Sequence, residues 1–195
     1  MTEYYPSFEV ERWRAINRNR QIKMKKIRTP LDSKEIRKLK AGDEVLLSGI
    51  IYTARDEAHL KLVELIEKSK TFPVELKGEI VYYSGPAPSG THVIGSCGPT
   101  TSNRMDFFTP QLLKGGVKYM IGKGARSKEV ARAIKRYSGI YFLAPGGAGA
   151  YLSLKIKNCN VVAFKNLGPE AIYKLEVENF PLVVGIDCKG NDMYR

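Results

Sequence analysis

The sequence contains few of the residues that bind metals. Three of its 195 residues are cysteines (Cys97, Cys159 and Cys188) and two are histidines. No CxxC motif occurs, and the cysteines are too few and too widely spaced to predict a disulfide framework, a zinc site or an iron–sulfur cluster held by this chain alone. Because Cys159 and Cys188 lie in strand-like apolar runs, we expect them to be buried structural thiols.

Long hydrophobic runs are also absent. No apolar stretch approaches the ~18 residues that cross a bilayer. The first residues, MTEYYPSFEV, lack the apolar segment and the cleavage site of a secretory signal. We therefore expect a cytoplasmic protein that makes no contact with a membrane. A hydrophobic content of 43% and a charged content of 27% are ordinary for a globular domain.

Acidic residues are fewer than basic ones, which leaves a formal net charge of +12. The excess is concentrated in residues 1–28, where eight Lys and Arg residues accompany three Glu residues. We therefore divide the chain into a basic N-terminal extension, residues 1–28, and a single domain, residues 29–195. A basic balance favours anionic partners, but it also arises on a solubilising surface. Because no nucleic-acid-binding module is recognisable, we expect no nucleic-acid partner.

Strand-like and helical patterns alternate from about residue 78 onward, which predicts a layered α/β domain. An earlier strand at 45–53 can pair differently and form a small β-layer. The expected strands cover residues 45–53, 78–85, 91–97, 118–122, 139–144, 160–164 and 181–188. The expected helices cover residues 33–39, 56–69, 101–114, 127–138, 150–156 and 169–175, with N-caps at Asp32 or Ser33, at Thr101 or Ser102, and at Ser127.

Four polar segments follow expected strands, at the positions where ligands gather in open α/β sheets. They cover residues 52–59, 98–106, 121–124 and 145–150. In the first segment, Arg55 lies near a helix N-terminus, where exposed N–H groups and the helix dipole favour an anion. A guanidinium there can grip a carboxylate with two hydrogen bonds, or it can pair with a neighbouring acid.

The second segment, GPTTSNRMD, places three consecutive hydroxyl residues after a Gly-Pro turn. If a helix starts near Thr101, Thr100 presents a hydroxyl at its mouth, and Arg104 lies one turn further on the same side. The alternative is a capping segment whose hydroxyls satisfy backbone donors. Since one cap needs one hydroxyl, at least one hydroxyl is left to explain.

Glycines mark the other two segments. In IGKG, the flanking glycines leave Lys123 unshielded, and its compact charge suits a carboxylate or a phosphate. The run at 145–150 can cradle an anion on backbone N–H groups, or it can allow close packing. Neither run has the spacing of a P-loop or a dinucleotide site, which argues against a nucleotide-binding enzyme. His59 and His92 fit no catalytic pattern, and we assign neither a proton-transfer role.

Taken in order, these segments resemble the β domain of the class I (iron–sulfur-dependent) fumarase and L(+)-tartrate dehydratase family. The resemblance covers about residues 27–195, and its most specific part is GPTTSNRMD followed by IGKG. The other matching stretches are RTPLDSKEIRKLKAGDEVLLSG, YTARDEAH, YYSGPAP and NLGPEAIYKLEVENFPLVVGIDCKGND. The resemblance implies a single layered α/β domain of the swivelling type. Because the chain has no room for a cluster-binding domain, it resembles a separate β subunit.

The resemblance also implies the cofactor, the partner and the site residues. A [4Fe–4S] cluster would be bound by a partner α subunit and not by this chain, and its open iron position would act as a Lewis acid on the substrate. Arg55, Arg104 and Lys123 match the family's carboxylate-binding residues. Thr100 matches the catalytic base, a role in which a hydroxyl needs help from the partner chain.

Two reactions fit this resemblance. The first is the reversible hydration of fumarate to malate, and the alternative is the dehydration of L(+)-tartrate to oxaloacetate. Both substrates are dicarboxylates that would use the same cationic groups, so residues of the α subunit are expected to set the choice between them. A homodimer or an α2β2 assembly is consistent with the resemblance.

Overall fold

The computed structural model describes residues 24–89 and 93–195, which fold around one seven-stranded sheet. Four strands run parallel in the order β2-β3-β4-β5. Strand β7 runs antiparallel and pairs with both β5 and β2, so that these five strands form a closed ring. The ring strands are β2 (Glu44–Thr53), β3 (Ile80–Tyr82), β4 (Tyr119–Gly122), β5 (Ile140–Leu143) and β7 (Ile172–Ile186). Outside the ring, β1 (Lys25–Arg28) pairs with β2, and β6 (Ile156–Ala163) pairs with β7.

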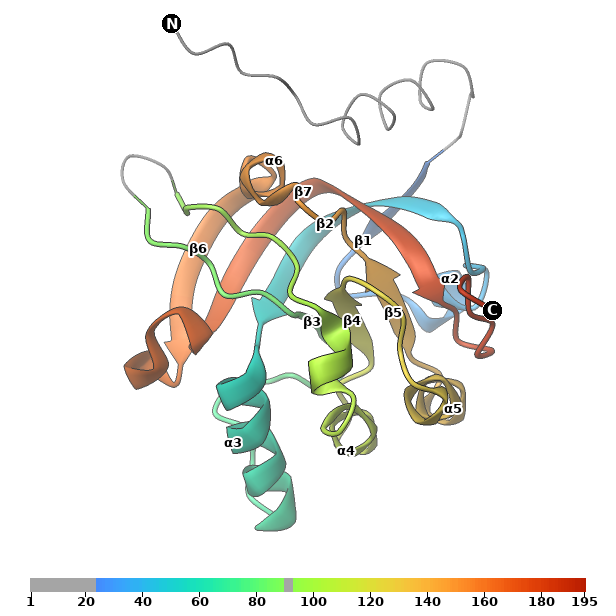
Figure 1. The fold of residues 1–195 in the computed structure, drawn as a ribbon, viewed down its shortest axis with the longest axis horizontal. Helices are drawn as coiled ribbons and strands as arrows, with labels where there is room; N and C mark the ends of the chain where they lie inside the picture. Colours follow the sequence, from blue (N-terminus) through green and yellow to red (C-terminus); the bar gives the residue numbers. More distant parts are fainter. Residues whose placement is uncertain (1–23, 90–92) are drawn as a thin grey trace, which may run out of the picture.

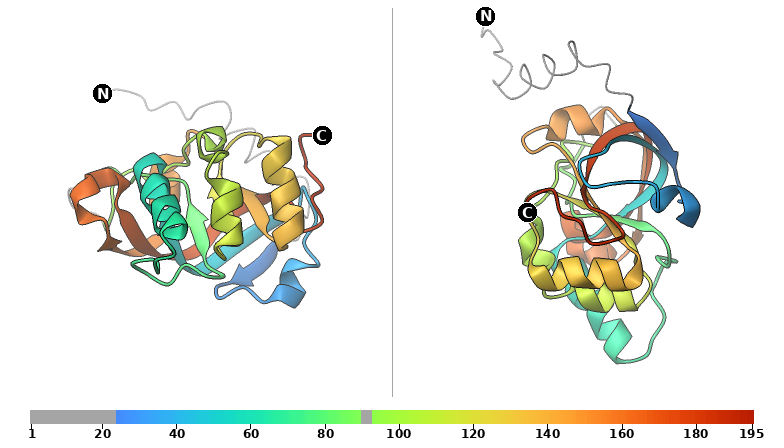
Figure 2. Two further views of the ribbon diagram at one scale, coloured as in Figure 1. Left: turned by 90° about the horizontal axis from the view of Figure 1, so that it is seen from below. Right: turned by 90° about the vertical axis from the view of Figure 1, so that its right-hand side faces the viewer.

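Figure 1 shows three layers, with β2 and β7 arching over β3–β5 and three helices on the opposite side. These helices are α3 (Asp56–Glu67), α4 (Thr109–Lys114) and α5 (Lys128–Tyr137). They lie side by side across the same face of the sheet (Figure 2). The shorter helical elements are α2 (Ser33–Ile36), η1 (Ser102–Met105), α6 (Gly149–Ser153) and η2 (Lys165–Glu170).

The alternation of side chains along each strand produces two hydrophobic cores. On β3, Ile80 and Tyr82 face the core enclosed by the ring. Val81 and the following Tyr83 face the core beneath the helices. Because both faces of β3–β5 are covered, these strands read as continuous apolar runs such as IYFL, as buried parallel strands do.

The predicted mixed α/β class is confirmed, as are most of the expected elements. Two predicted helix caps are also confirmed: Asp32 accepts from Lys34 N, and Ser127 accepts from Val130 N. The strand at 45–53 becomes β2, which pairs in parallel with β1 and β3 and antiparallel with β7. It belongs to the same seven-stranded sheet and, with β7, forms the layer that arches over β3–β5. None of the helices in the described ranges is long and apolar enough to cross a membrane.

Several expectations about single elements were wrong. No strand forms within 93–97, where loop hydrogen bonds such as Ala87 N to Ser96 O take the backbone groups instead. The helix expected at 101–114 is divided into η1 and α4. Residues 172–175, expected to be helical, belong to β7, because they pair with β6 and with β2.

The predicted N-terminal extension is only partly described. Residues 1–23 lie outside the described residues. Residues 25–28 form β1, which pairs in parallel with residues 45–48 of β2. Ile27 is buried in the ring core, so this end of the predicted extension packs as part of the sheet.

Candidate functional site

Three of the four polar segments meet where the parallel strands end. Arg55 follows β2, and Lys123 follows β4 directly. The GPTTSNRMD segment crosses between these two positions. Thr100 N donates a 2.7 Å hydrogen bond to the carbonyl of Tyr83, just beyond β3, and Thr101 bridges to Lys123. The carboxyl edge of the sheet therefore gathers the residues that the sequence singled out.

Asp56 holds the centre of this cluster. Its Oδ2 atom accepts a 2.9 Å hydrogen bond from Arg104 Nη2 and lies 3.8 Å from Arg55 Nη2. The same Arg104 nitrogen lies 3.4 Å from Thr100 Oγ1. Arg55 and Arg104, which come from two separate segments, are thus brought together at one carboxylate, and Thr100 lies beside Arg104. Arg104 is the more exposed of the two arginines, with 48% of its side chain accessible to solvent.

Arg55 is fixed more tightly than Arg104. Its Nη2 atom lies 3.5 Å from Glu170 Oε1, and 26% of the side chain is exposed. A Cβ atom on Gly85 would come within 2.8 Å of Arg55 Cδ and Nη1, so the absence of a side chain at Gly85 makes room for the guanidinium. Glu170 also accepts a 2.9 Å hydrogen bond from Glu57 N at the start of α3. The helix N-terminus that was expected to favour an anion therefore already has one.

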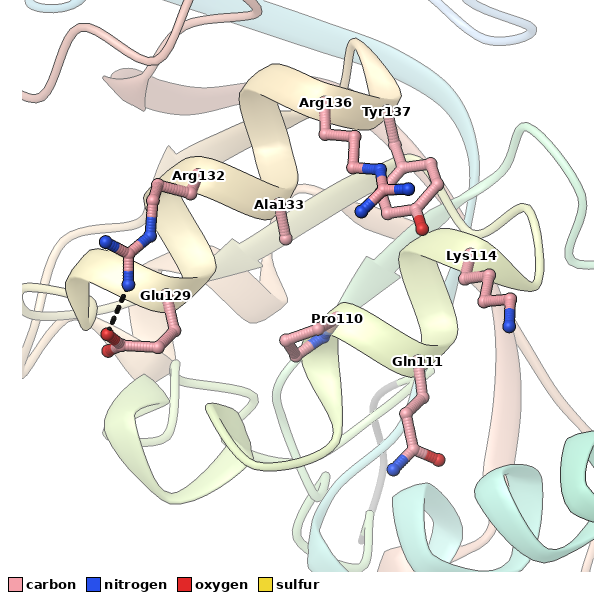
Figure 3. A pocket seen from close by; sticks show the side chains of 8 residues that line it. All are labelled: Pro110, Gln111, Lys114, Glu129, Arg132, Ala133, Arg136 and Tyr137. Carbon is pink, nitrogen blue, oxygen red and sulfur yellow. Dashed lines mark hydrogen bonds and ion pairs between the residues drawn. The ribbon is translucent and has the colours of Figure 1, made fainter.

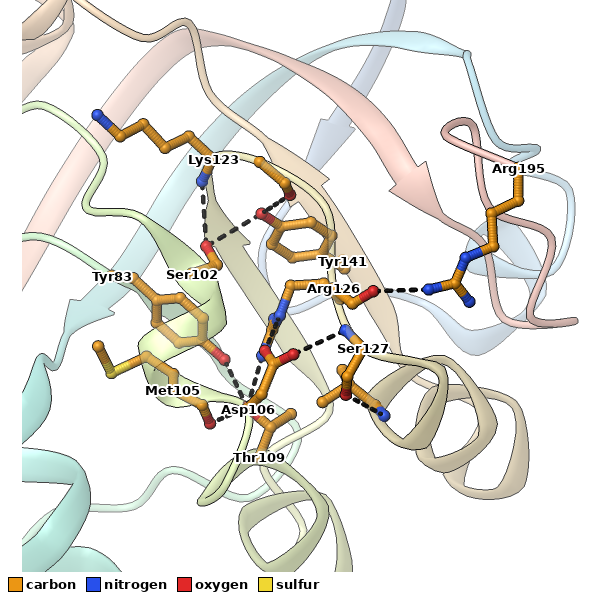
Figure 4. A network of polar contacts seen from close by, with 12 residues as sticks. Tyr83, Ser102, Met105, Asp106, Thr109, Lys123, Arg126, Ser127, Tyr141 and Arg195 are labelled. Atoms are coloured by element: carbon orange, nitrogen blue, oxygen red, sulfur yellow. Dashed lines mark hydrogen bonds and ion pairs between the residues drawn. The ribbon is translucent and has the colours of Figure 1, made fainter.

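Lys123 is placed by its backbone. Its N–H donates to Ser102 Oγ at 3.1 Å, and its carbonyl accepts from Ser102 N at 3.1 Å. A Cβ atom on Gly122 would overlap the Ser102 hydroxyl, so Gly122 is needed for this approach. Within the described ranges, Lys123 Nζ has no hydrogen bond or ion pair. Figure 4 shows its side chain extending away from Ser102 and Tyr141.

The three hydroxyl residues have three different environments. Thr100 lies beside Arg104, while Thr101 is exposed and makes no capping hydrogen bond with its side chain. Ser102 is fully buried and joins the backbone of Lys123 to the hydroxyl of Tyr141. The predicted cap at Thr101 or Ser102 is therefore wrong, because Ser102 turns inward and Thr101 remains outside.

The glycine run at 145–150 contributes close packing. A Cβ atom on Gly149 would come within 2.4 Å of Ser96 Oγ and 3.0 Å of Gly98 N. A Cβ atom on Gly146 would lie 3.8 Å from Lys123 Cδ, which places this loop beside the lysine side chain. These contacts support the packing alternative for Gly149.

His59 is fully buried under the cluster. Its Nδ1 atom lies 2.8 Å from the carbonyl of Arg55, which fixes the residue before α3. Burial lowers the pKa of His59 to about 4, so the ring is neutral at physiological pH. His59 Nε2 has no hydrogen-bond partner in the described part of the chain, and the ring packs edge-on against Tyr83. His92 lies outside the described residues.

The cysteines do not fit an iron–sulfur cluster. Cys97 is fully buried, lies 3.3 Å from Ser84 Oγ, and has its pKa raised by burial to about 11, which disfavours the ligating thiolate. Cys188 is buried, as expected, whereas Cys159 on β6 is only partly buried. No group of three or more His, Cys, Asp or Glu residues that could hold a metal occurs in the two described ranges.

Two carboxylates in the cluster were not among the predicted site residues, although pairing of Arg55 with a neighbouring acid was the alternative left open, and Asp56 is such an acid. Arg55, Arg104 and Lys123 supply three positive charges, and Asp56 and Glu170 supply two negative ones. Glu170 lies more than a hundred positions from Arg55 in the chain, and no local sequence pattern predicts that they pair. Asp56 is adjacent to Arg55, and its place in the first turn of α3 was the one available signal. The cluster retains net positive charge and a hydroxyl, which suits an anionic ligand with its own hydrogen-bonding groups.

A hollow lies elsewhere, between α4 and α5. Its volume is about 490 Å³, and Pro110, Lys114, Glu129, Arg136 and Tyr137 line it (Figure 3). Glu129 is already paired with Arg132 at 2.7 Å. The predicted site residues line none of it.

Comparison with known proteins decides the family. The family model described as Fumarase C-terminus matches residues 2–195. The chain belongs to this family. The resemblance to class I fumarases and tartrate dehydratase β subunits is thereby confirmed.

Two kinds of relative differ in how much of them the chain covers. It is 42% identical to the Methanocaldococcus jannaschii protein named "Putative L(+)-tartrate dehydratase subunit beta", over 85% of this chain and 88% of the relative. It is 44% identical to the anaerobic class I fumarate hydratase of Escherichia coli over 76% of this chain, but over only 28% of that protein. It is 39% identical to Fumarate hydratase 2 of Leishmania major, over 86% of this chain and 30% of that protein. The chain spans less than a third of the two hydratases.

Proposed function

We propose that this chain is the β subunit of a two-chain [4Fe–4S]-dependent hydro-lyase that reversibly hydrates fumarate to malate. The observation that carries the proposal is the convergence of Arg55 and Arg104 on one carboxylate, with Thr100 beside Arg104 and Lys123 joined to the same loop. Nearly full coverage of a relative named as a β subunit supports the two-chain arrangement. The cluster belongs, in this proposal, to the α subunit, where it supplies Lewis-acid chemistry.

The residues of this chain bind and orient the dicarboxylate. A dianion needs two or more positive anchors, and the three cations come from separate loops, so they can contact carboxylates at both ends of a short molecule. When a proton leaves the carbon next to a carboxylate, negative charge spreads onto that carboxylate. Fixed cations stabilise the charge where it develops.

Thr100 is the proposed base for that proton. A threonine hydroxyl is barely acidic and needs assistance to accept a proton from carbon. Arg104 Nη2, 3.4 Å from Thr100 Oγ1, provides a positive charge that favours the deprotonated oxygen. Further assistance is assigned to the α subunit.

The domain is proposed to be of the swivelling type and to close over the partner's cluster. Its cationic edge is then the surface that faces the α subunit, in a single αβ pair or an α2β2 assembly. Dehydration of L(+)-tartrate is the alternative reaction, favoured by the name of the archaeal relative. The cytoplasmic location stays a prediction.

Anaerobic hydration of fumarate tests the proposal. The chain is assayed alone and after mixing with a cluster-loaded α partner, following the ultraviolet absorbance of the double bond. We expect activity only in the mixture, and a parallel assay with L(+)-tartrate separates the two reactions. If a mixture with a verified intact cluster converts neither acid, the proposed function is wrong.

A further inference from the structure

The network of polar contacts in Figure 4 contains a guanidinium, that of Arg126, close to Asp106 and Tyr141. Arg126 is 3% exposed, and its side chain is completely buried. Its Nε atom donates to Asp106 Oδ1 at 2.6 Å, and its Nη2 atom donates to Thr109 Oγ1 at 2.7 Å. The guanidinium also lies over the rings of Tyr83 and Tyr141, at 5.3 and 4.8 Å from their centres.

The Arg126–Asp106 pair connects the two loops that carry the proposed carboxylate anchors. Asp106 comes two residues after Arg104, and Arg126 comes three residues after Lys123. The second oxygen of Asp106 accepts a 2.7 Å hydrogen bond from Ser127 N, at the start of α5. Both carboxylate oxygens are therefore occupied, which leaves this link little freedom to rotate.

Tyr141 makes a second link between the same loops. Its hydroxyl lies 3.0 Å from Ser102 Oγ and 2.9 Å from the carbonyl of Gly124. Ser102 Oγ in turn accepts from Lys123 N. Burial raises the pKa of the Tyr141 hydroxyl, so it stays protonated and keeps these contacts. The backbone at Lys123 and Gly124 is thus linked to Tyr141 twice, through the Ser102 hydroxyl and through the carbonyl of Gly124.

This network does more than stability alone requires. Burying an ion pair costs desolvation free energy, and apolar side chains of similar volume are often equally stabilising. Arg126 Nη1 is buried without a hydrogen-bond partner in the described part of the chain, a further cost. What a fixed ion pair adds, and apolar packing does not, is a definite separation between the two loops.

We propose that Arg126 is a positioning residue that sets the separation between Arg104 and Lys123, and with it the length of dicarboxylate that the site accepts. The inference rests on the proposed function. A ligand with charges at both ends binds well only if the two anchors match its span. Misplacement of an anchor by ~1 Å can cost ~10²-fold in rate.

The test compares Arg126→Lys with Val130→Ala in the assembled αβ enzyme. Lysine keeps the charge but cannot reach Asp106, Thr109 and both rings together. Val130 is fully buried in the same helix-side core and its side chain has no polar atom, so Val130→Ala leaves the backbone contacts in place and reports a general loss of stability. Thermal unfolding and co-purification with the α chain verify that both variants fold and assemble.

We expect Arg126→Lys to raise the KM for fumarate ~10-fold or more, within the range that anchor misplacement produces. The ratio of the inhibition constants of succinate and glutarate, which differ by one methylene, should move toward 1. Val130→Ala should change neither by more than about twofold. An unchanged KM and ratio in folded Arg126→Lys, or equal changes in both variants, would overturn the inference.

Two further measurements cover the remaining cases. Should Arg126→Lys not fold, Tyr141→Phe removes only the hydroxyl that contacts Ser102 and Gly124, and the same changes are expected at smaller size. Should the wild-type αβ mixture convert neither acid, the proposed function has failed. The positioning role is then judged from backbone amide NMR of the full chain. Shifts at Lys123 and Ser102 in Arg126→Lys, absent in Val130→Ala, support it, and unshifted amides refute it.

Discussion

Asp56 accepts a 2.9 Å hydrogen bond from Arg104, across 48 residues of sequence. The carboxylate therefore occupies the guanidinium that we propose binds substrate, and a substrate carboxylate must compete with it. Asp56 also lies 3.8 Å from Arg55, so one acid offsets part of two cationic charges.

Removing this competing charge is expected to strengthen anion binding. Asp56→Asn keeps the size of the side chain but raises the net charge of the cluster by one. Because exposed ion pairs contribute about 0.2–1 kcal/mol, we expect the inhibition constant of succinate to fall by about 1.5- to 5-fold. Glu64→Gln is the control, since Glu64 is an exposed acid on the same helix, paired with Lys68. Weaker succinate binding in Asp56→Asn alone would mean that Asp56 orients Arg104 rather than competing for it.

Loss of the Arg104 guanidinium is expected to be costly. In the αβ enzyme, Arg104→Ala should lower kcat/KM for fumarate by ~10²–10³, as when a fixed donor to a developing charge is removed. Arg132→Ala removes another exposed arginine paired with an acid, but on α5, away from the site. Steady-state kinetics on both variants check the prediction. An Arg104→Ala enzyme as active as Arg132→Ala would exclude the anchor role.

The Thr100 hydroxyl is expected to affect turnover rather than binding. Thr100→Val keeps the shape and removes the oxygen, so kcat should fall by ~10²–10⁴ while KM changes little. The matched control is Thr101→Val, because Thr101 is exposed and its side chain caps nothing. Equal activity of the two valine variants would remove Thr100 from the proton-transfer step.

Sequence patterns singled out the residues that this cluster brings together because strand ends and helix starts are local features. Arg55, Thr100, Arg104 and Lys123 were selected by what immediately precedes them, and the closed ring of strands brings those places to one edge. Glu170 could not be found in this way, because its pairing with Arg55 depends on how β7 and η2 return to the sheet. Local sequence patterns do not specify where such a distant segment is placed in the fold.

The wrong element predictions have the same origin. The run at 91–97 is apolar enough for a strand, yet within its described part Cys97 offers its carbonyl to the hydroxyl of Tyr82 instead of to a neighbouring strand. The helix expected at 101–114 breaks near Asp106, whose carboxylate is engaged by Arg126 and Ser127. In both places a long-range contact outweighs local propensity.

Stability should depend on pH through His59. Its folded-state pKa, about 4, lies below the usual 6.5, so the unfolded chain binds more protons between these values. The contribution of the neutral ring to the free energy of unfolding is therefore complete above pH 6.5 and is lost as the pH falls toward 4. Its full size is on the order of 3 kcal/mol. The free energy of unfolding, measured with urea, should differ less between pH 7.5 and pH 5 for His59→Gln than for wild type. Identical pH slopes would contradict the assignment.

The position of the Arg55 guanidinium can be tested by adding a single methyl group beside it, at Gly85. In Gly85→Ala, the new Cβ would lie 2.8 Å from Arg55 Cδ and Nη1 and 2.9 Å from the carbonyl of Pro169, which cannot move as easily. The guanidinium must therefore shift away from its present place. Gly146→Ala is the matched control, because its Cβ would meet Lys123 Cδ at an ordinary 3.8 Å. We expect Gly85→Ala to raise the KM for fumarate ~10-fold or more, as misplacement of an anchor does, while Gly146→Ala stays within about twofold of wild type. If Gly85→Ala binds fumarate as well as Gly146→Ala does, the present position of Arg55 is not the one that the substrate uses.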